Sequence, residues 1–122
     1  MHIIDSSITV EGLRVRANHG VMPQERAVGN DFVVSATLRY DATLAAHSDE
    51  IAEALNYAEV IETIKSEMAV PSRLIEHAAG RIAAALLHDF PIITGGTVTV
   101  SKPHPPVRAQ LAAASVTIAF SR

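Results

Sequence analysis

The fold class is decided where the chain reads NYAEVIETIKSEM, from Asn56 to Met68. Asn is a frequent helix N-cap residue, and Glu59 places an acid three residues after Asn56, as in a capping box. Apolar residues then share one face at helical spacing, namely Val60, Ile61, Ile64 and Met68. This pattern predicts a helix from about Tyr57 to Met68.

The segments on either side of this helix have a different period. Apolar residues alternate with polar ones along residues 8–17, interrupted near Gly12, and along residues 32–40, which predicts two strands. A second helix is predicted to open at Pro71-Ser72 and to stop before Pro91. Two further strands are predicted at residues 97–102 and 113–120. This order predicts an α+β fold, an antiparallel four-stranded sheet with two helices on one face.

Length and composition fit a single domain that spans residues 1–122. With 48% hydrophobic and 19% charged residues, the chain can build one hydrophobic core and is not expected to be disordered. Its formal net charge of −3 argues against nucleic acid or anionic membrane as a partner. The absence of cysteine excludes disulfides, thiolate nucleophiles and cysteine–zinc sites. The longest apolar run, residues 82–87, is too short to cross a bilayer, and we expect a cytoplasmic protein.

A four-stranded sheet that is covered on one face leaves two edge strands with unpaired backbone groups. Three prolines follow the third predicted strand instead of interrupting it, so they do not protect an edge: Pro103, Pro105 and Pro106. We therefore expect the chain to assemble, with strand edges pairing between subunits in a closed ring.

Few residues stand out as candidates for chemistry. The connection from His19 to Asn30 is long, and loops of this length in a small domain tend to be functional. The chain has no strong metal-binding pattern, no glycine-rich phosphate loop and no serine nucleophile elbow. What remains is a set of acids, one tyrosine and one lysine: Glu25, Glu76, Tyr57 and Lys102.

Each candidate has a structural interpretation beside a functional one. Glu76 can be a first-turn acid favoured by the helix dipole, or a carboxylate that accepts two parallel N–H bonds from an amino-pyrimidinone edge. Tyr57 can pack with a hydrated hydroxyl, or present a proton donor beyond the helix end. Lys102 can be a solvated charge at a strand end, although the proline-rich run after it fixes it well. Glu25 can be a local partner of Arg26.

Five motifs extend over most of the chain, from about Ile8 to Ile118. They are His19-Gly20-Val21 with Glu25-Arg26, Ser48-Asp49, Asn56-Tyr57-Ala58-Glu59-Val60, Leu74-Ile75-Glu76 and Val100-Ser101-Lys102-Pro103. In this order and spacing they resemble the successive motifs of dihydroneopterin aldolase. The resemblance implies the tunnelling fold, in which subunits pair edges into a ring tetramer and two rings commonly stack as an octamer. It also implies active sites between neighbouring subunits.

The activity that the resemblance implies is the cleavage of 7,8-dihydroneopterin into 6-hydroxymethyl-7,8-dihydropterin and glycolaldehyde, a step of folate synthesis. Epimerisation of the substrate is an implied side reaction. No cofactor, metal or Schiff base is implied, because the dihydropterin's own C=N bond accepts the electrons. By position, Lys102 and Tyr57 match the proton-transfer pair, and Glu76 matches the residue that anchors the pterin.

Three other positions match the family pattern. Ile75 and Leu55 match residues whose backbone borders the pterin, and Glu25 matches the loop acid that helps to bind substrate or relay protons. The loop departs from the pattern at Met22, where an aromatic residue is frequent, and at Gly29-Asn30, where Gly-Gln is common.

Two alternatives stay open. A dihydroneopterin triphosphate epimerase shares the implied fold, but the Lys102-Pro103 pair favours the aldolase and the loop lacks a basic cluster for a triphosphate. A pterin-binding module without catalysis would also keep the fold, but the intact set of candidate side chains argues against it. A pyruvoyl-tetrahydropterin synthase is disfavoured, because its zinc-binding histidines are missing.

Overall fold

In the computed structural model, which describes residues 1–122, strand β2 (Asn30–Arg39) runs through the middle of the sheet. Apolar and polar residues alternate along β2, so the strand has one buried face and one open face. Four residues are buried: Phe32, Val34, Ala36 and Leu38. β2 pairs antiparallel with β1 (Ser7–Ala17) and with β3 (Gly95–Lys102), and β4 (Ala114–Ser121) pairs antiparallel with β3. The sheet order is therefore β1-β2-β3-β4.

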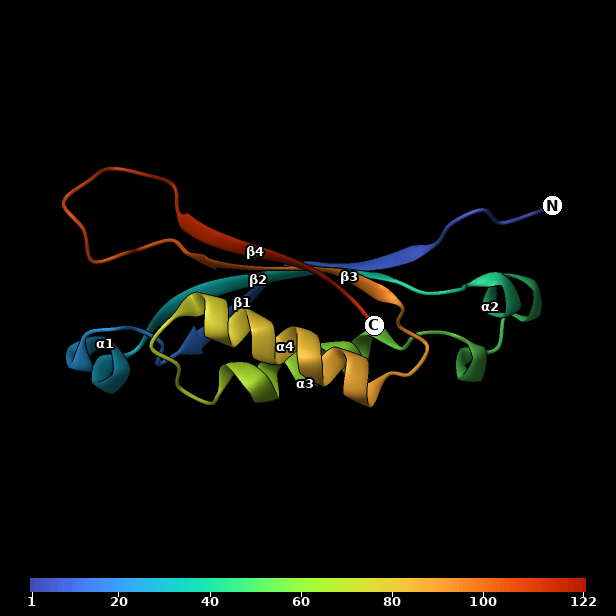
Figure 1. Ribbon diagram of the computed structural model, residues 1–122, viewed down its shortest axis with the longest axis horizontal. Helices are drawn as coiled ribbons and strands as arrows, with labels where there is room; N and C mark the ends of the chain where they lie inside the picture. The colour runs from blue at the N-terminus through green and yellow to red at the C-terminus, as the bar shows by residue number, and fades with distance from the viewer.

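Two helices, α3 (Tyr57–Met68) and α4 (Ile75–Asp89), cover one face of this sheet (Figure 1). They run antiparallel to each other. Near one end the Thr63 hydroxyl donates to Asp89 at 3.1 Å, and near the other end Arg81 donates to the Glu67 carboxylate at 2.9 Å. The predicted α+β fold, with an antiparallel four-stranded sheet and two helices on one face, is confirmed.

The predicted start of α3 is confirmed at the Asn56 cap. The Asn56 side-chain oxygen accepts a hydrogen bond from the Ala58 N–H at 3.0 Å, which satisfies one of the free donors of the first turn. Glu59 makes no return bond to the Asn56 N–H, so the capping box is incomplete. The predicted apolar face points into the core, where three of its residues are fully buried: Val60, Ile64 and Met68.

The second helix begins later than predicted. The sequence predicts a start at Pro71-Ser72, whereas α4 begins at Ile75. The Ser72 N–H donates to His19 Nδ1 at 2.9 Å, and the Ser72 carbonyl accepts from the Gly20 N–H at 2.9 Å. The Ser72 backbone thus bonds to residues 19 and 20 instead of entering a helical turn, and Glu76 becomes the second residue of the helix.

Three short helical elements were absent from the sequence prediction: α1 (Pro23–Val28), α2 (Thr43–Ser48) and the 3-10 helix η1 (Ile51–Glu53). Each is at most six residues long, too short for an apolar period to show. Asp49 ends α2 in the left-handed conformation, with φ of 59°. None of the helices in the protein combines the length and the apolar character needed to span a membrane.

The predicted interruption of β1 near Gly12 is a β-bulge. The register with β2 shifts between Val10 and Leu13, and Gly12 has φ of +70°, which favours glycine. The Gly12 N–H donates to the Ser35 hydroxyl at 2.9 Å, so the bulge leaves this donor satisfied.

The face of the sheet opposite the helices carries small hydroxyl side chains. Cross-strand pairs form between Thr9 and Thr37 at 3.2 Å, between Thr99 and Thr117 at 2.8 Å, and between Ser101 and Ser115 at 2.8 Å. The apolar side chains of the strands are thus concentrated on the helix-covered side.

Candidate active site

Strand β3 ends with Lys102, whose ammonium lies 2.8 Å from the Glu25 carboxylate of α1. The two side chains are only 13% and 12% exposed, so the ion pair is largely withdrawn from water. The hydrogen bond from Lys102 lowers the pKa of Glu25, while burial acts in the opposite direction. An ammonium has three donors, and two of them remain for a third group such as a water or a ligand.

An aromatic and an imidazole ring lie beneath this ion pair. The Lys102 nitrogen is 5.7 Å from the centre of the Phe32 ring, within cation–π range. The His19 ring packs edge-on against Phe32, with 5.2 Å between the ring centres, and is fully buried. Burial, aided by the charges of Arg81 and Lys102, lowers the pKa of His19 from 6.5 to about 4, against the opposing effect of the Met68 carbonyl. His19 is therefore neutral near pH 7.

The loop that carries Glu25 is held closely against it. A Cβ atom on Gly20 would overlap the Glu25 side chain, so glycine is needed for this approach. Arg26 donates to the carbonyls of Gly20 and Val21, each at 2.8 Å. The Met22 N–H donates to Glu25 at 3.3 Å. Arg26 therefore stabilises the loop backbone and does not pair with Glu25. The cation that donates a hydrogen bond to Glu25 is Lys102.

The first turn of α4 presents Ile75 and Glu76. Glu76 is exposed, and the N–H groups of Ile75 and Glu76 have no acceptor within the chain, because no helical turn precedes them. This turn thus offers free backbone donors beside a carboxylate acceptor. This turn is complementary to a flat heterocycle whose edge carries N–H donors next to an acceptor.

The Glu76 turn and the Lys102–Glu25 pair lie at the same end of the domain. The Gly20 N–H donates to the carbonyl of Ser72, which is four residues before Glu76, and the Glu25 side chain packs against Gly20. Four of the six predicted site residues are therefore brought to one end, namely Glu25, Ile75, Glu76 and Lys102.

The other two predicted residues, Leu55 and Tyr57, lie at the opposite end of the helix pair. Tyr57 is the first residue of α3 and is 63% exposed. A rise of 1.5 Å per residue puts its backbone about 16 Å from Met68, where α3 ends near the Glu76 turn. The Leu55 side chain is buried in the core, which leaves only its backbone for a ligand.

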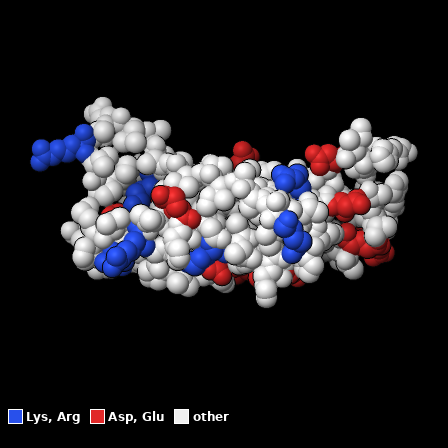
Figure 2. All heavy atoms as spheres, in the orientation of Figure 1, with Lys and Arg blue, Asp and Glu red and all other residues white.

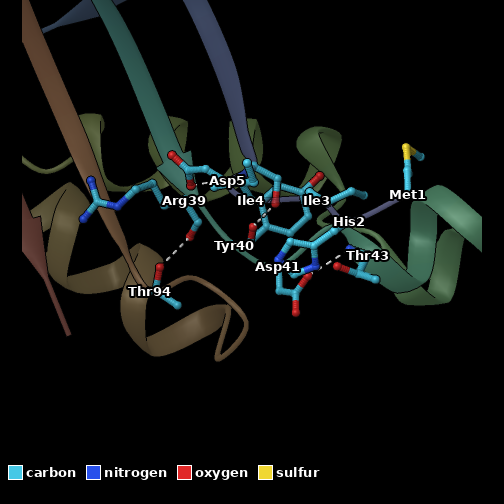
Figure 3. Close-up of a pocket in the computed structure, with 11 residues that line it drawn as sticks. Met1, His2, Ile3, Ile4, Asp5, Arg39, Tyr40, Asp41, Thr43 and Thr94 are labelled. Atoms are coloured by element: carbon cyan, nitrogen blue, oxygen red, sulfur yellow. Dashed lines mark hydrogen bonds between the residues drawn. The ribbon is translucent and has the colours of Figure 1, made fainter.

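None of the three cavities of 410 to 480 Å³ is lined by the six predicted residues, and the one of 480 Å³ borders Phe32 and Pro103, next to Lys102. Figure 3 shows the one of 470 Å³, between the N-terminal segment (residues 1–6) and the chain that leaves β2, from Arg39 to Asp41. No three histidine, aspartate or glutamate side chains come together in a way that could hold a metal ion. The candidate residues thus form open surfaces at the two ends of a single chain.

These two ends carry different charge. Acidic side chains gather over α2 and η1 (Figure 2), a segment that contains Asp41, Asp49, Glu50 and Glu53. Lysine and arginine side chains are more frequent at the opposite end, over α1 and the loop after β3, to which Arg26 and Arg108 belong.

Sequence reasoning missed two residues that shape this end of the domain. Phe32 has the signature of an ordinary strand core residue, and nothing in its spacing shows that its ring underlies Lys102. Arg81 makes most of its hydrogen bonds to backbone carbonyls and a buried serine, which leave no trace in a sequence.

Comparison with known proteins gives one consistent result. The family model described as FolB, dihydroneopterin aldolase, matches residues 8–119. The dihydroneopterin aldolase of Methylorubrum extorquens is 38% identical over 117 residues, which cover 94% of this chain and 89% of that protein. The enzyme of Staphylococcus epidermidis is 37% identical over 101 residues, covering 82% and 84% of the two chains. The solved structure of E. coli dihydroneopterin aldolase in complex with neopterin has a TM-score of 0.87 and 29% identity, covering 95% of this chain and 99% of that one.

Proposed function

Because the chain belongs to the dihydroneopterin aldolase family, we propose that it cleaves 7,8-dihydroneopterin at a site that two copies of the chain build together. The products are 6-hydroxymethyl-7,8-dihydropterin and glycolaldehyde, so the reaction belongs to folate synthesis. The neopterin held by the E. coli relative supports a pterin ligand.

The observation that carries this proposal is the separation of Tyr57 from the other candidate residues. Glu25, Glu76 and Lys102 share one end of the domain, and Tyr57 starts α3 about 16 Å from its last residue, Met68. A tyrosine that acts on the same ligand then has to come from a neighbouring copy. Neighbouring copies can close into a ring by pairing the free edges of β1 and β4.

The chemistry needs an electron sink, because breaking the carbon–carbon bond beside an alcohol leaves an electron pair on carbon. The C=N bond of the dihydropterin ring accepts this pair and forms an enamine. One hydroxyl proton of the side chain is removed as glycolaldehyde leaves, and one proton is then added to the carbon that stays on the ring. The protein therefore has to hold the ring and move protons.

Each candidate residue has one role in this scheme. Glu76 and the free N–H groups of its turn hold the amino-pyrimidinone edge of the ring. Lys102, oriented by Glu25 at 2.8 Å, positions a water for proton transfer near the ring nitrogen. Tyr57 of the neighbouring copy delivers the final proton to carbon. If the departing aldehyde turns before the bond re-forms, the same site epimerises the substrate.

Subunit complementation tests the shared site directly. Lys102→Ala and Tyr57→Phe should each lower turnover by about 10²–10⁴-fold, the usual effect of a general acid–base group. When the two variants are refolded together in equal amounts, about a quarter of the sites in mixed rings receive both residues. Glycolaldehyde and pterin products are quantified for the mixture and for each variant alone. Mixed rings seen by native mass spectrometry without any regained activity would contradict a site built by two copies.

Two further measurements test the remaining parts of the proposal. Borohydride reduction in the presence of substrate should leave Lys102 unmodified, since the ring and not a lysine imine accepts the electrons. Sedimentation should give a closed assembly, a ring tetramer or two stacked rings. A stable monomer at micromolar concentration would rule out the ring.

A further inference from the structure

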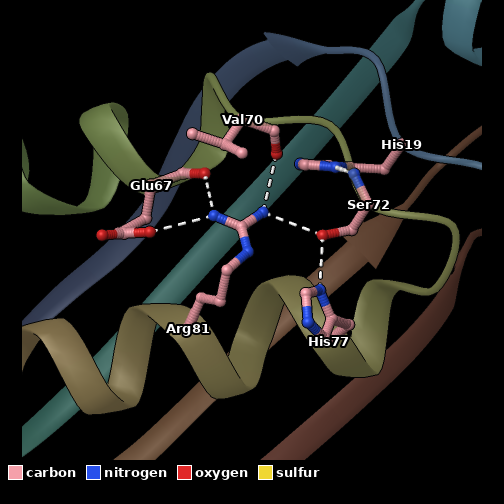
Figure 4. A network of polar contacts seen from close by, with 6 residues as sticks. All are labelled: His19, Glu67, Val70, Ser72, His77 and Arg81. Carbon is pink, nitrogen blue, oxygen red and sulfur yellow. Dashed lines mark hydrogen bonds and ion pairs between the residues drawn. The ribbon is translucent and has the colours of Figure 1, made fainter.

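Ser72 joins three segments of the chain through every polar group that it has (Figure 4). Its N–H donates to His19 Nδ1 and its carbonyl accepts from the Gly20 N–H, both at 2.9 Å. Its hydroxyl accepts from Arg81 Nη2 at 2.8 Å and lies 2.8 Å from His77 Nδ1, to which its hydrogen is free to point. Ser72 is only 6% exposed, so these groups are not available to a substrate.

Arg81 fixes the segment that carries Ser72. Its Nη1 donates to the Glu67 carbonyl at 2.7 Å and to the Glu67 carboxylate at 2.9 Å, and its Nη2 also donates to the Val70 carbonyl at 2.6 Å. The planar fork of a guanidinium can hold several acceptors at fixed angles, which a lysine ammonium cannot do. The last turn of α3 and the link to α4 are thereby tied to the middle of α4.

Ser72 stands between the two parts of the site that share this end of the domain. Along the chain it is four residues before Glu76, the residue that holds the ring in the proposed function. Across the chain its bonds reach Gly20, which packs against Glu25, and Glu25 accepts the hydrogen bond from Lys102 at 2.8 Å. A shift of Ser72 would therefore move the Glu76 turn relative to Lys102.

We propose that Ser72, held by Arg81, is a positioning residue that sets the spacing between the Glu76 carboxylate and the Lys102 ammonium. This inference rests on the proposed function of those two groups. Loss of the Ser72 hydroxyl removes one of the two acceptors of Arg81 Nη2 and the contact to His77, so the link between α3 and α4 loses bonds that fix its position. A displacement of about 1 Å at a catalytic group can lower the rate by about a hundredfold.

The first test compares Ser72→Ala with Ser66→Ala, a matched change at an exposed serine of α3 that makes no side-chain hydrogen bond. With folding checked by circular dichroism, Ser72→Ala should raise KM for dihydroneopterin and lower kcat, so that kcat/KM falls about tenfold to a hundredfold. Ser66→Ala should leave both constants unchanged. Unaltered kinetics in folded Ser72→Ala would overturn the proposal.

The second test separates positioning from a general loss of structure. In a Lys102→Ala background there is no ammonium left to align, so adding Ser72→Ala should produce no further fall in kcat. An equal fall in both backgrounds would show a merely structural role. If Lys102→Ala alone keeps full activity, the proposed function is wrong. If Lys102→Ala loses turnover as expected but Ser72→Ala has wild-type kinetics, only the positioning role of Ser72 is wrong.

A second variant keeps the proposal open to test if Ser72→Ala does not fold. Arg81→Lys retains the charge but removes the fork that reaches the Glu67, Val70 and Ser72 acceptors. It should raise KM and lower kcat in the same sense as Ser72→Ala, and its effect on kcat should also vanish in the Lys102→Ala background. Wild-type kinetics in folded Arg81→Lys would overturn the proposal.

Discussion

Mild acid should destabilise this protein through His19. Its pKa is about 4 in the folded protein and 6.5 when exposed, so between these pH values only the unfolded chain binds the proton. The free energy of unfolding therefore falls as the pH falls through this window, by up to about 1.4 kcal/mol per pH unit from this group. A pKa difference of about 2.5 units gives a total loss of roughly 3 kcal/mol. Above pH 6.5 neither state binds the proton, and the contribution is constant.

His19→Asn is the matched control for this effect. An asparagine side-chain oxygen can replace Nδ1 as the acceptor of the Ser72 N–H, but it does not titrate. Glu25 and the other carboxyl groups contribute to the pH dependence of both proteins, so the difference between the two curves isolates His19.

The assay is urea unfolding followed by circular dichroism between pH 7 and about pH 4, at one fixed protein concentration because assembly couples to stability. The wild-type protein should lose roughly 3 kcal/mol more than His19→Asn across this range. If the two proteins lose the same free energy per pH unit, His19 does not remain neutral in the fold, and the reasoning from its burial is wrong.

Four other substitutions give distinct outcomes. Gly20→Ala should displace Glu25 and lower kcat/KM. Gly80→Ala, in the middle of α4, adds a Cβ that meets nothing within 4 Å, so it should leave activity intact and stabilise the protein by up to about 1 kcal/mol. Equal activity in the two variants would contradict the close approach at Gly20. Asn56→Ala should cost about 1 kcal/mol of stability in urea unfolding, and no loss would mean that the cap does not limit α3. Glu76→Ala should weaken neopterin binding, measured by isothermal titration, more than it changes the thermal midpoint, and unchanged affinity would remove its role as the ring anchor.

The long elements of the fold could be predicted because their signals are local and repeated. The strict alternation that starts at Phe32 and the helical face that follows Asn56 each extend over several residues, and the structure has both. The start of α4 could not be predicted, since it depends on the bonds from Ser72 to His19 and Gly20, which are more than fifty residues away in sequence. The six-residue helices α1 and α2 are too short to carry a period.

The site was predictable only through its motifs. Ordinary physical reasoning on Lys102 favours a solvated charge at a strand end, and the structure instead buries it against Glu25. The sequence gives no indication that Tyr57 and Glu76 lie at opposite ends of the helix pair, because their separation follows from the packing of α3 against α4. The roles of the site residues, the closed ring and the cytoplasmic location stay predictions.

The hydroxyl pairs on the uncovered face of the sheet have a consequence for the size of the protein. Threonine and serine side chains exchange partners with water at little cost, so this face needs no second layer of helices to shield it. A chain of 122 residues can therefore gather the apolar side chains of its sheet and its two long helices in one interior and leave the reverse of the sheet wet. Such a surface can line an aqueous passage, and it tolerates exchanges among small polar residues far better than the packed side does.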